Sequence, residues 1–174
     1  MDGPGENLAF LAEGLQKCKA ITRKYGTSFF FATQFFPPET RDGIYAIYSF
    51  ARIPDEIVDD HEKEGKAATL AQLNEWRDRW LAAMKAGRSD DDVMNAIVHT
   101  FRKYVIPVEE GEAFLLSMFM DEEKSTYADY AELEEYMHGS AGVIGLVVTR
   151  IVGFSSEEAF PHALKLGYAF QLTN

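Results

Sequence analysis

The stretch that decides the fold is residues 48–60, which read Tyr-Ser-Phe-Ala-Arg-Ile-Pro-Asp-Glu-Ile-Val-Asp-Asp. Asp55 and Asp59 are four positions apart, so on a helix their carboxylates share one face, about one turn from each other. Tyr48 and Arg52 extend the same face toward the N-terminus. The stretch therefore predicts a helix that presents two carboxylates, a guanidinium and a phenol on one face.

Two like charges at this spacing repel by a few tenths of a kcal/mol on a bare helix, so the pair is mildly unfavourable without a partner. Mg²⁺ would remove that penalty, since it prefers carboxylate oxygen and is commonly completed by substrate phosphates. The alternative is an acidic helix end that faces water. Pro54 predicts a kink or a fresh helix start at Asp55, and both outcomes keep Asp55 and Asp59 together.

Helical spacing recurs on both sides of this stretch, which predicts an all-α fold in a single helical domain over residues 1–174. Apolar residues follow one helical face over residues 8–18, and Gly26 ends that helix. Further helices are expected over residues 39–60, 70–84, 90–104, 110–120 and 130–136, and after Gly153 with Ser155 or Ser156 as the cap. The small residues of 139–145 suit either close helix contact or a loosened helix.

Aromatic side chains are concentrated in residues 29–36, where they could wall a dry pocket or form ordinary core. Trp76 and Trp80 fall on an amphipathic helix and are expected in the core.

Charge and cysteine content narrow the class of protein. The 17 basic and 28 acidic side chains give a net charge of −11 and no basic cluster, so a nucleic-acid partner is not expected. Cys18 is the only cysteine, and the N-terminus lacks the basic and apolar parts of a secretory signal. We expect a cytoplasmic, soluble protein and leave peripheral membrane contact open. The oligomeric state is not indicated.

Four motifs in order carry a family resemblance. They are Ser28-Phe29-Phe30, then residues 45–48 running into Arg52 and 55–59, then the glycines of 139–145, then Leu166-Gly167 with Gln171-Leu172 and Asn174. With these motifs the chain resembles the squalene and phytoene synthases, the all-helical enzymes that join two prenyl diphosphates head to head. The sequence of residues 55–59 looks closer to that of the phytoene synthases than to that of the squalene synthases.

The resemblance implies an isoprenoid-synthase-type helical bundle, of which this chain is the N-terminal portion. It implies Mg²⁺, with Mn²⁺ as an alternative, held by Asp55, Asp59 and Asn174. The catalytic residues that it implies are Asp55, Asp59, Arg52 and Tyr48. The substrate-binding residues that it implies are Ser28, Phe29, Arg52, Tyr48, Gln171 and Asn174.

The implied reaction is a transfer between two prenyl diphosphates through a cyclopropyl diphosphate, most simply geranylgeranyl diphosphate to phytoene. One alternative is squalene or dehydrosqualene synthesis from farnesyl diphosphate, with NADPH needed only for squalene. Another, from a different class, is a non-catalytic relative that serves as an assembly factor or binding scaffold.

Three departures from the family pattern affect these expectations. The family's second acidic motif begins at the position of Asn174 and continues beyond it, so the chain looks like a fragment of a longer enzyme and we expect the 174 residues to be inactive alone. His138 replaces a usual tyrosine, and Thr126 replaces a common arginine. A solvated helix residue is the favoured interpretation of His138.

Overall fold

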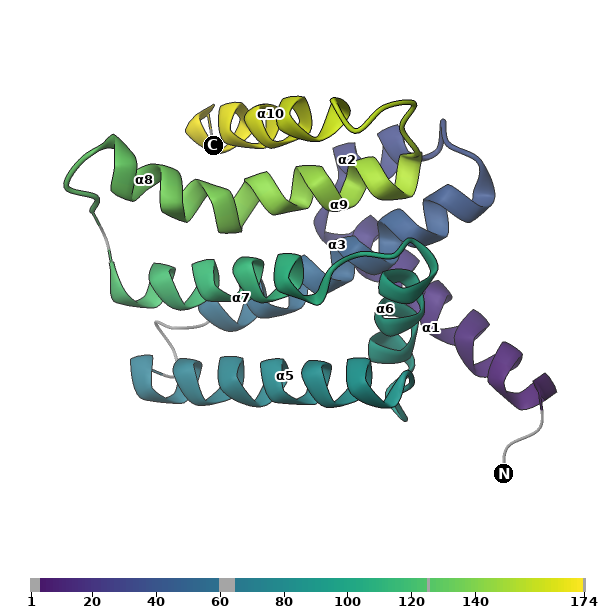
Figure 1. Cartoon of the computed structure of the whole chain (residues 1–174). Coiled ribbons are helices and arrows are strands. Elements are labelled where there is room, and N and C mark those ends of the chain that lie inside the picture. The colour runs from purple at the N-terminus through teal and green to yellow at the C-terminus, as the bar shows by residue number, and fades with distance from the viewer. Residues whose placement is uncertain (1–3, 60–64, 125, 174) are drawn as a thin grey trace. The chain divides into compact units, whose positions relative to one another are not determined.

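The computed structural model describes residues 4–59, 65–124 and 126–173, with side chains from residue 9 onward. Within these ranges every regular element is a helix (Figure 1), so the all-α prediction is confirmed. The helices are α1 (Pro4–Tyr25), α2 (Thr27–Thr33), α3 (Pro38–Asp59), α5 (Lys66–Ala86), α6 (Asp92–Lys103), α7 (Val108–Glu123), α8 (Tyr130–Met137), the π-helix η1 (His138–Gly142), α9 (Val143–Val152) and α10 (Ala159–Thr173).

Short polar residues and glycine set several helix ends. The helix α1 ends directly before Gly26, as expected. Asp91 caps α6, because its Oδ1 accepts a hydrogen bond from the Met94 amide at 2.8 Å. Asp129 caps α8 in the same way, with a 3.0 Å bond from the Glu132 amide. Each cap satisfies an amide that the first helical turn would otherwise leave without an acceptor.

Two predicted boundaries are placed differently by the structure. The fresh helix start at Asp55 does not occur, because α3 runs through Pro54 as one helix. A proline inside a helix withholds one N–H and crowds the preceding turn, yet here Pro54 is buried and the helix is kept. The last helix, α10, begins at Ala159 rather than directly after the expected cap Ser155 or Ser156, although the Glu158 amide does bond to Ser156 Oγ at 3.2 Å.

The chain divides into two compact units that share α3 and α5. The first unit comprises Met1–Arg52 and Arg79–Val105, and the second comprises Ile53–Asp78 and Ile106–Asn174. Each unit is described by itself. The prediction of one domain over 1–174 stays a prediction.

An aromatic cluster forms the core of the first unit. The ring of Phe50 lies 5.1 Å from Trp80 and 5.1 Å from Phe101, and the last two rings are 5.4 Å apart. All three side chains are buried, and Trp76 is buried in the second unit. The prediction that both tryptophans belong to the core is confirmed. Tilted and edge-to-face rings of this kind add about 0.5–1.5 kcal/mol per pair to the burial itself.

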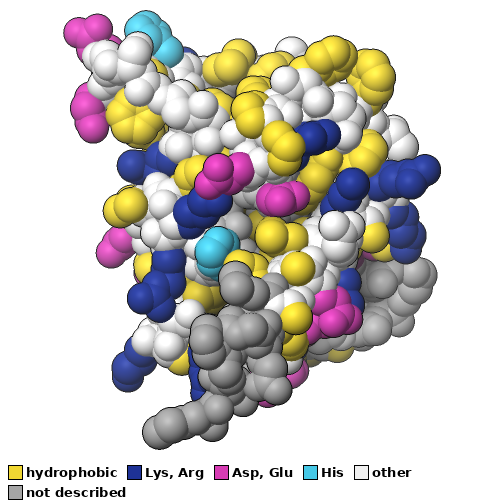
Figure 2. Space-filling view, turned by 90° about the vertical axis from the view of Figure 1, so that its right-hand side faces the viewer, with side chains coloured by type: hydrophobic (Ala, Val, Ile, Leu, Met, Phe, Trp, Pro, Cys, Tyr) yellow, Lys and Arg dark blue, Asp and Glu magenta, His cyan; other side chains and the backbone are white. Residues whose placement is uncertain are grey.

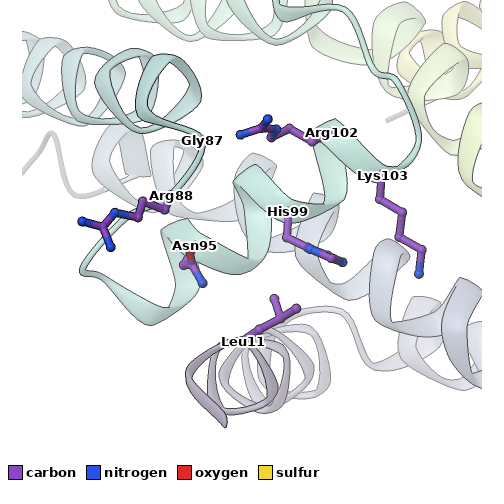
Figure 3. A pocket seen from close by; sticks show the side chains of 7 residues that line it. All are labelled: Leu11, Gly87, Arg88, Asn95, His99, Arg102 and Lys103. Atoms are coloured by element: carbon purple, nitrogen blue, oxygen red, sulfur yellow. The ribbon is translucent and has the colours of Figure 1, made fainter. Parts of the chain in front are cut away.

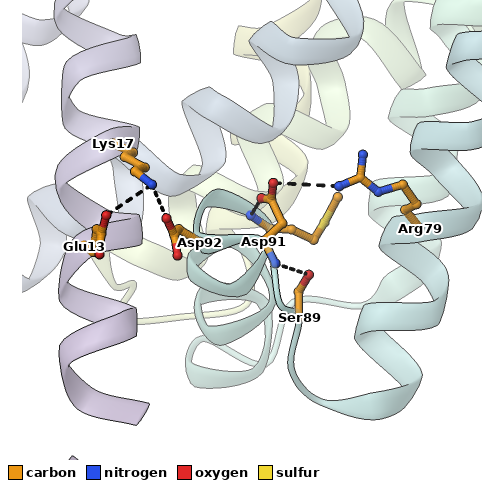
Figure 4. A network of polar contacts seen from close by, with 7 residues as sticks. Glu13, Lys17, Arg79, Ser89, Asp91 and Asp92 are labelled. Carbon is orange, nitrogen blue, oxygen red and sulfur yellow. Dashed lines mark hydrogen bonds and ion pairs between the residues drawn. The ribbon is translucent and has the colours of Figure 1, made fainter. Parts of the chain in front are cut away.

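A polar network joins α1 and α5 to the start of α6 (Figure 4). Lys17 on α1 contacts Glu13 at 3.2 Å and also pairs with Asp92 at the start of α6. Arg79 on α5 lies 3.7 Å from the carboxylate of the capping residue Asp91. Surface pairs of this kind stabilise a fold by about 0–1 kcal/mol each, so the network sets orientation more than stability.

Cys18 is enclosed by this unit, where Tyr45, Ala46 and Ala96 surround it. Burial raises the pKa of its thiol to about 11. We expect iodoacetamide at pH 8 to label the native chain about 100-fold more slowly than the urea-unfolded chain, because the thiolate fraction falls about tenfold per pH unit below the pKa. Mass spectrometry of quenched samples measures both rates, and equal rates would contradict the buried position.

The same burial makes stability depend on alkaline pH. The unfolded thiol loses its proton near the ordinary pKa of 9.0, whereas the folded thiol keeps it until about pH 11. The unfolded chain therefore binds fewer protons between these values, so the free energy of unfolding falls as pH rises from 9 to 11. A Cys18→Ala variant should lack this part of the pH dependence.

Close helix packing centres on η1 in the second unit. Figure 1 shows α8, η1 and α9 as one run with α7 and α10 on its two sides, and η1 contacts both of these helices. A Cβ built on Gly139 would lie 2.5 Å from the Ala113 carbonyl oxygen of α7, and one on Gly167 would lie 2.5 Å from the Ala141 carbonyl oxygen. Both expectations for residues 139–145 are met, since the helix is loosened and its glycines admit close neighbours.

Large apolar side chains reach the surface at many points, as the yellow atoms in Figure 2 show. The most exposed among the described aromatic residues are Phe35 at 80% and Phe31 at 66%. Within the described ranges, no helix combines the length and the apolar character that a bilayer crossing requires.

Candidate functional site

The helix α3 carries four of the predicted catalytic residues, Tyr48, Arg52, Asp55 and Asp59. Because α3 continues through Pro54, the two aspartates stand one turn apart on an unbroken helix. Asp55 is partly buried, whereas Asp59 is exposed at the helix end. The pairing that the spacing predicted is therefore present in the backbone. Tyr48 and Arg52 belong to the first unit, and the aspartates belong to the second.

In the first unit, α1 and α2 bring aromatic groups onto α3. The ring of Phe29 stacks on Tyr48 with centroids 5.3 Å apart. The guanidinium carbon of Arg52 lies 4.9 Å from the centre of the Tyr25 ring, a cation–π arrangement. Three predicted residues are thus gathered on one face. Tyr25 was not identified from the sequence, and its ring contacts Arg52, the residue that was expected to bind phosphate.

Gly26 explains how α2 comes so close to α3. A Cβ at this position would lie 2.7 Å from the hydroxyl oxygen of Tyr48, closer than any real side chain allows. The missing side chain therefore lets the chain turn directly over Tyr48. Ser28, another predicted substrate-binding residue, is exposed on α2.

The second unit assembles a polar group that the sequence did not predict. The Tyr136 hydroxyl on α8 donates a hydrogen bond to Asp121 Oδ2 on α7 at 3.1 Å. Gln171 on α10 donates its Nε2 hydrogen to the Tyr136 oxygen at 3.4 Å. The Tyr127 ring lies 5.2 Å from that of Tyr136. Gln171, a predicted substrate-binding residue, is therefore held in a network that spans three helices.

The charges around Asp121 raise the energy of its ionised form. Burial raises the pKa of the Asp121 carboxyl, and the negative charges of Asp55 and Glu122 raise it further, while the Tyr136 bond acts in the opposite direction. Burial and the neighbouring Asp121 also raise the pKa of Tyr136, which therefore keeps its proton at neutral pH. Since the carboxylates repel one another, a cation near Asp55 would stabilise all of them.

The donor set suits a hard cation. Asp55 and Asp59 offer carboxylate oxygens, the ligands that Mg²⁺ prefers. Within the described residues, no cluster of three or more acid, histidine or cysteine side chains has the geometry of a complete metal cage. Mg²⁺ is usually held by one or two carboxylates and completed by waters and phosphates, so the pair fits that pattern. The third predicted ligand, Asn174, lies outside the described residues.

The remaining predicted positions lie on the surface. His138 is exposed, with Nδ1 at 3.3 Å from the Tyr168 hydroxyl, which agrees with a solvated helix residue. Thr126 is exposed as well. In the aromatic stretch, Phe31 and Phe35 are exposed, so the ordinary-core interpretation is wrong for these two. Phe30 instead stacks on the buried Tyr45 at 5.6 Å.

Comparison with solved structures defines the class of fold. A dehydrosqualene synthase matches with a TM-score of 0.85 at 24% identity, covering 97% of this chain and 57% of that one. A squalene synthase from Alicyclobacillus acidocaldarius matches with a TM-score of 0.81, also at 24% identity, covering 94% of this chain and 60% of that one. The fold is therefore the all-α fold of these synthases.

Residues 22–174 match the family model described as squalene/phytoene synthase. The chain belongs to the squalene/phytoene synthase family. It is 30% identical over 183 residues to the 15-cis-phytoene synthase of Synechococcus elongatus, covering 98% of this chain and 58% of that protein. It is 33% identical over 177 residues to phytoene synthase 1, chloroplastic, of Solanum lycopersicum, covering 98% of this chain and 42% of that protein. The chain thus spans about half the length of these relatives.

Proposed function

We propose that this chain is part of a prenyltransferase that condenses two molecules of geranylgeranyl diphosphate head to head to phytoene. The observation that carries the proposal is the aspartate pair, one turn apart on an unbroken α3, with the charge of Asp55 acting on Asp121. Family membership and the phytoene synthase names of its relatives support the same reaction. Condensation of farnesyl diphosphate to squalene or dehydrosqualene is the alternative substrate choice.

The chemistry requires departure of a diphosphate and protection of the resulting allylic cation. Bound Mg²⁺ supplies positive charge that neutralises the leaving diphosphate. Asp55 and Asp59 would hold this ion. Arg52 is proposed to contact phosphate oxygens, for which its planar guanidinium provides paired donors.

The aromatic residues have a separate role in the proposal. A cation formed by loss of diphosphate reacts with water unless the site is dry. Phe29 and Tyr48, stacked at 5.3 Å, offer an apolar wall whose π-faces also stabilise positive charge. The Tyr136 hydroxyl stays neutral because its pKa is raised. It donates its proton in a hydrogen bond to Asp121 and accepts a hydrogen bond from Gln171.

A product assay tests the substrate and the reaction together. The full-length protein that contains this chain is incubated with geranylgeranyl or farnesyl diphosphate, each with Mg²⁺, with Mn²⁺ and with EDTA, and with or without NADPH. We expect phytoene from geranylgeranyl diphosphate only when a divalent metal is present. If only farnesyl diphosphate is converted, to squalene or dehydrosqualene, then farnesyl diphosphate is the substrate and the alternative reaction is correct. No hydrocarbon from either would contradict the enzymatic proposal and favour a binding scaffold.

A further inference from the structure

A basic pocket lies in the first unit and is lined by none of the residues assigned above. Its volume is about 590 Å³, which is within the range of small-molecule sites. Three elements line it: α1, the turn after α5, and α6 (Figure 3). Its basic side chains are Arg88, His99, Arg102 and Lys103.

The helix α6 places these groups together through its spacing. Asn95, His99 and Lys103 are successive residues four apart on one helical face, and Arg102 stands next to that face. In Figure 3, Asn95 and His99 point to the side where Leu11 of α1 lies, and Arg102 extends toward the turn at Gly87. The pocket is therefore lined by nitrogen groups and bordered by one apolar side chain.

Gly87 makes room for one of these groups. Its backbone has a φ of +74°, which favours glycine, and a Cβ at this position would overlap Nη1 of Arg102. The guanidinium can lie against the turn only because no side chain is present there. Within the described residues, the side chain of Arg102 makes no hydrogen bond and no ion pair. Its donors are thus available to a ligand.

The balance of charge in the pocket is positive. Lys103 is partly neutralised, because Glu39 accepts from its Nζ at 2.6 Å. Arg102 pairs with no acid among the described residues, so it contributes a permanent positive charge, and Arg88 lines the same pocket of a protein whose net charge is −11. Burial lowers the pKa of His99, and the charge of Lys103 lowers it further. The forked donors of arginine match phosphoryl oxygens in two-point contacts.

We propose that this pocket binds a small phosphate-class anion, such as inorganic pyrophosphate or a phosphate ester, without a metal ion. The site differs in sign from the aspartate pair on α3. Acidic side chains can hold a diphosphate only through a cation, whereas arginines bind it directly. If the proposed condensation is correct, its released pyrophosphate is a natural ligand, and that identification alone rests on the proposed function.

Side-chain NMR of the histidines tests the proposal on the 174-residue chain. Sodium pyrophosphate is titrated in EDTA at constant ionic strength, with sodium chloride as the matched salt. We expect the His99 resonances to shift and saturate, while those of His138 and His162 in the second unit stay unchanged. A His99→Gln variant assigns the signals. Shifts that never saturate, or that chloride reproduces, would overturn the proposal.

Matched variants separate this pocket from the aspartate pair. Arg102→Gln is expected to weaken pyrophosphate binding in EDTA at least tenfold, whereas Lys165→Gln, the same charge change on α10, should leave it unchanged. Arg88→Gln provides a second test if circular dichroism shows that Arg102→Gln does not fold. Asp55→Asn should leave this metal-independent binding intact, so failure of the proposed reaction would be distinguishable from failure of the pocket.

Vesicles distinguish a free anion from a lipid headgroup, which offers the same phosphoryl oxygens. The chain is sedimented with phosphatidylglycerol and phosphatidylcholine vesicles in EDTA. We expect pyrophosphate binding in solution with no more sedimentation on the anionic vesicles than on the neutral ones. Sedimentation on anionic vesicles without any pyrophosphate binding would overturn the small-anion proposal.

Discussion

The Asp55→Asn chain is expected to bind a non-hydrolysable geranylgeranyl thiodiphosphate more than about 100-fold more weakly than the unchanged chain in Mg²⁺. Loss of a residue that only orients a metal ligand typically costs 10–100-fold in affinity, and loss of a ligand should cost more. An amide also lacks the charge that balances the cation. Titration calorimetry measures the two affinities, each with Mg²⁺ and with EDTA.

Glu56→Gln is the matched control for that variant. It removes the same charge from the next residue of α3, which points to a different face of the helix because successive residues are 100° apart. We expect its Mg²⁺-dependent binding to stay within a few-fold of the unchanged chain, and both variants to keep their helical circular dichroism. An Asp55→Asn chain that binds normally would remove Asp55 from the site.

Gly167→Val should destabilise the second unit strongly. A Cβ at Gly167 would meet the Ala141 carbonyl oxygen at 2.5 Å, the Ala141 carbonyl carbon at 2.9 Å and the Gly142 Cα at 3.0 Å. All three are backbone atoms, so α10 or η1 has to move apart. Overpacking costs about 1–3 kcal/mol where side chains can yield, and we expect at least about 3 kcal/mol here. Urea unfolding followed by circular dichroism measures the loss.

Ala169→Val gives the corresponding control on the same helix. Ala169 is exposed, so its added methyl groups face water. Its effect should stay within about 0.5 kcal/mol, as for most surface substitutions. Equal destabilisation by the two variants would show that β-branching on α10, rather than contact with η1, causes the effect.

The helices were predictable because their signals are local. Apolar spacing of three and four residues and Gly26 predicted the end of α1 and the bounds of α3 closely. The path of α3 through Pro54 was not decided by the sequence, since the cost of an internal proline competes with the burial of its neighbours. Tertiary packing settled that competition in favour of one helix.

The candidate site was predictable where it depends on one helix, and hidden where it depends on several. Asp55 and Asp59 are four apart, so their relation follows from helix geometry alone. Asp121 and Tyr136 come from α7 and α8, and the hydrogen bond between their side chains depends on how those helices pack. One signal was available, because Tyr136 stands three residues before Gly139, the first glycine of a motif that carried the resemblance.

The basic pocket also could not be predicted from the sequence, because its charged residues are separated along the chain. A net charge of −11 and the lack of a basic cluster in the sequence argued against a nucleic-acid partner and gave no sign of a local basic pocket. Arg88 and Arg102 are 14 positions apart, so only the turn between α5 and α6 brings them to one pocket. The net charge of the whole chain therefore did not indicate the locally basic side chains of this pocket.

Anomalous diffraction can locate a metal ion between the aspartate pair and a bound diphosphate. Crystals of the chain are grown with Mn²⁺, as a substitute for Mg²⁺, and with geranylgeranyl thiodiphosphate. We expect a manganese peak within coordination distance of carboxylate oxygens of both Asp55 and Asp59, with diphosphate oxygens on its other side. Ordered diphosphate with no manganese at either aspartate would contradict this expectation.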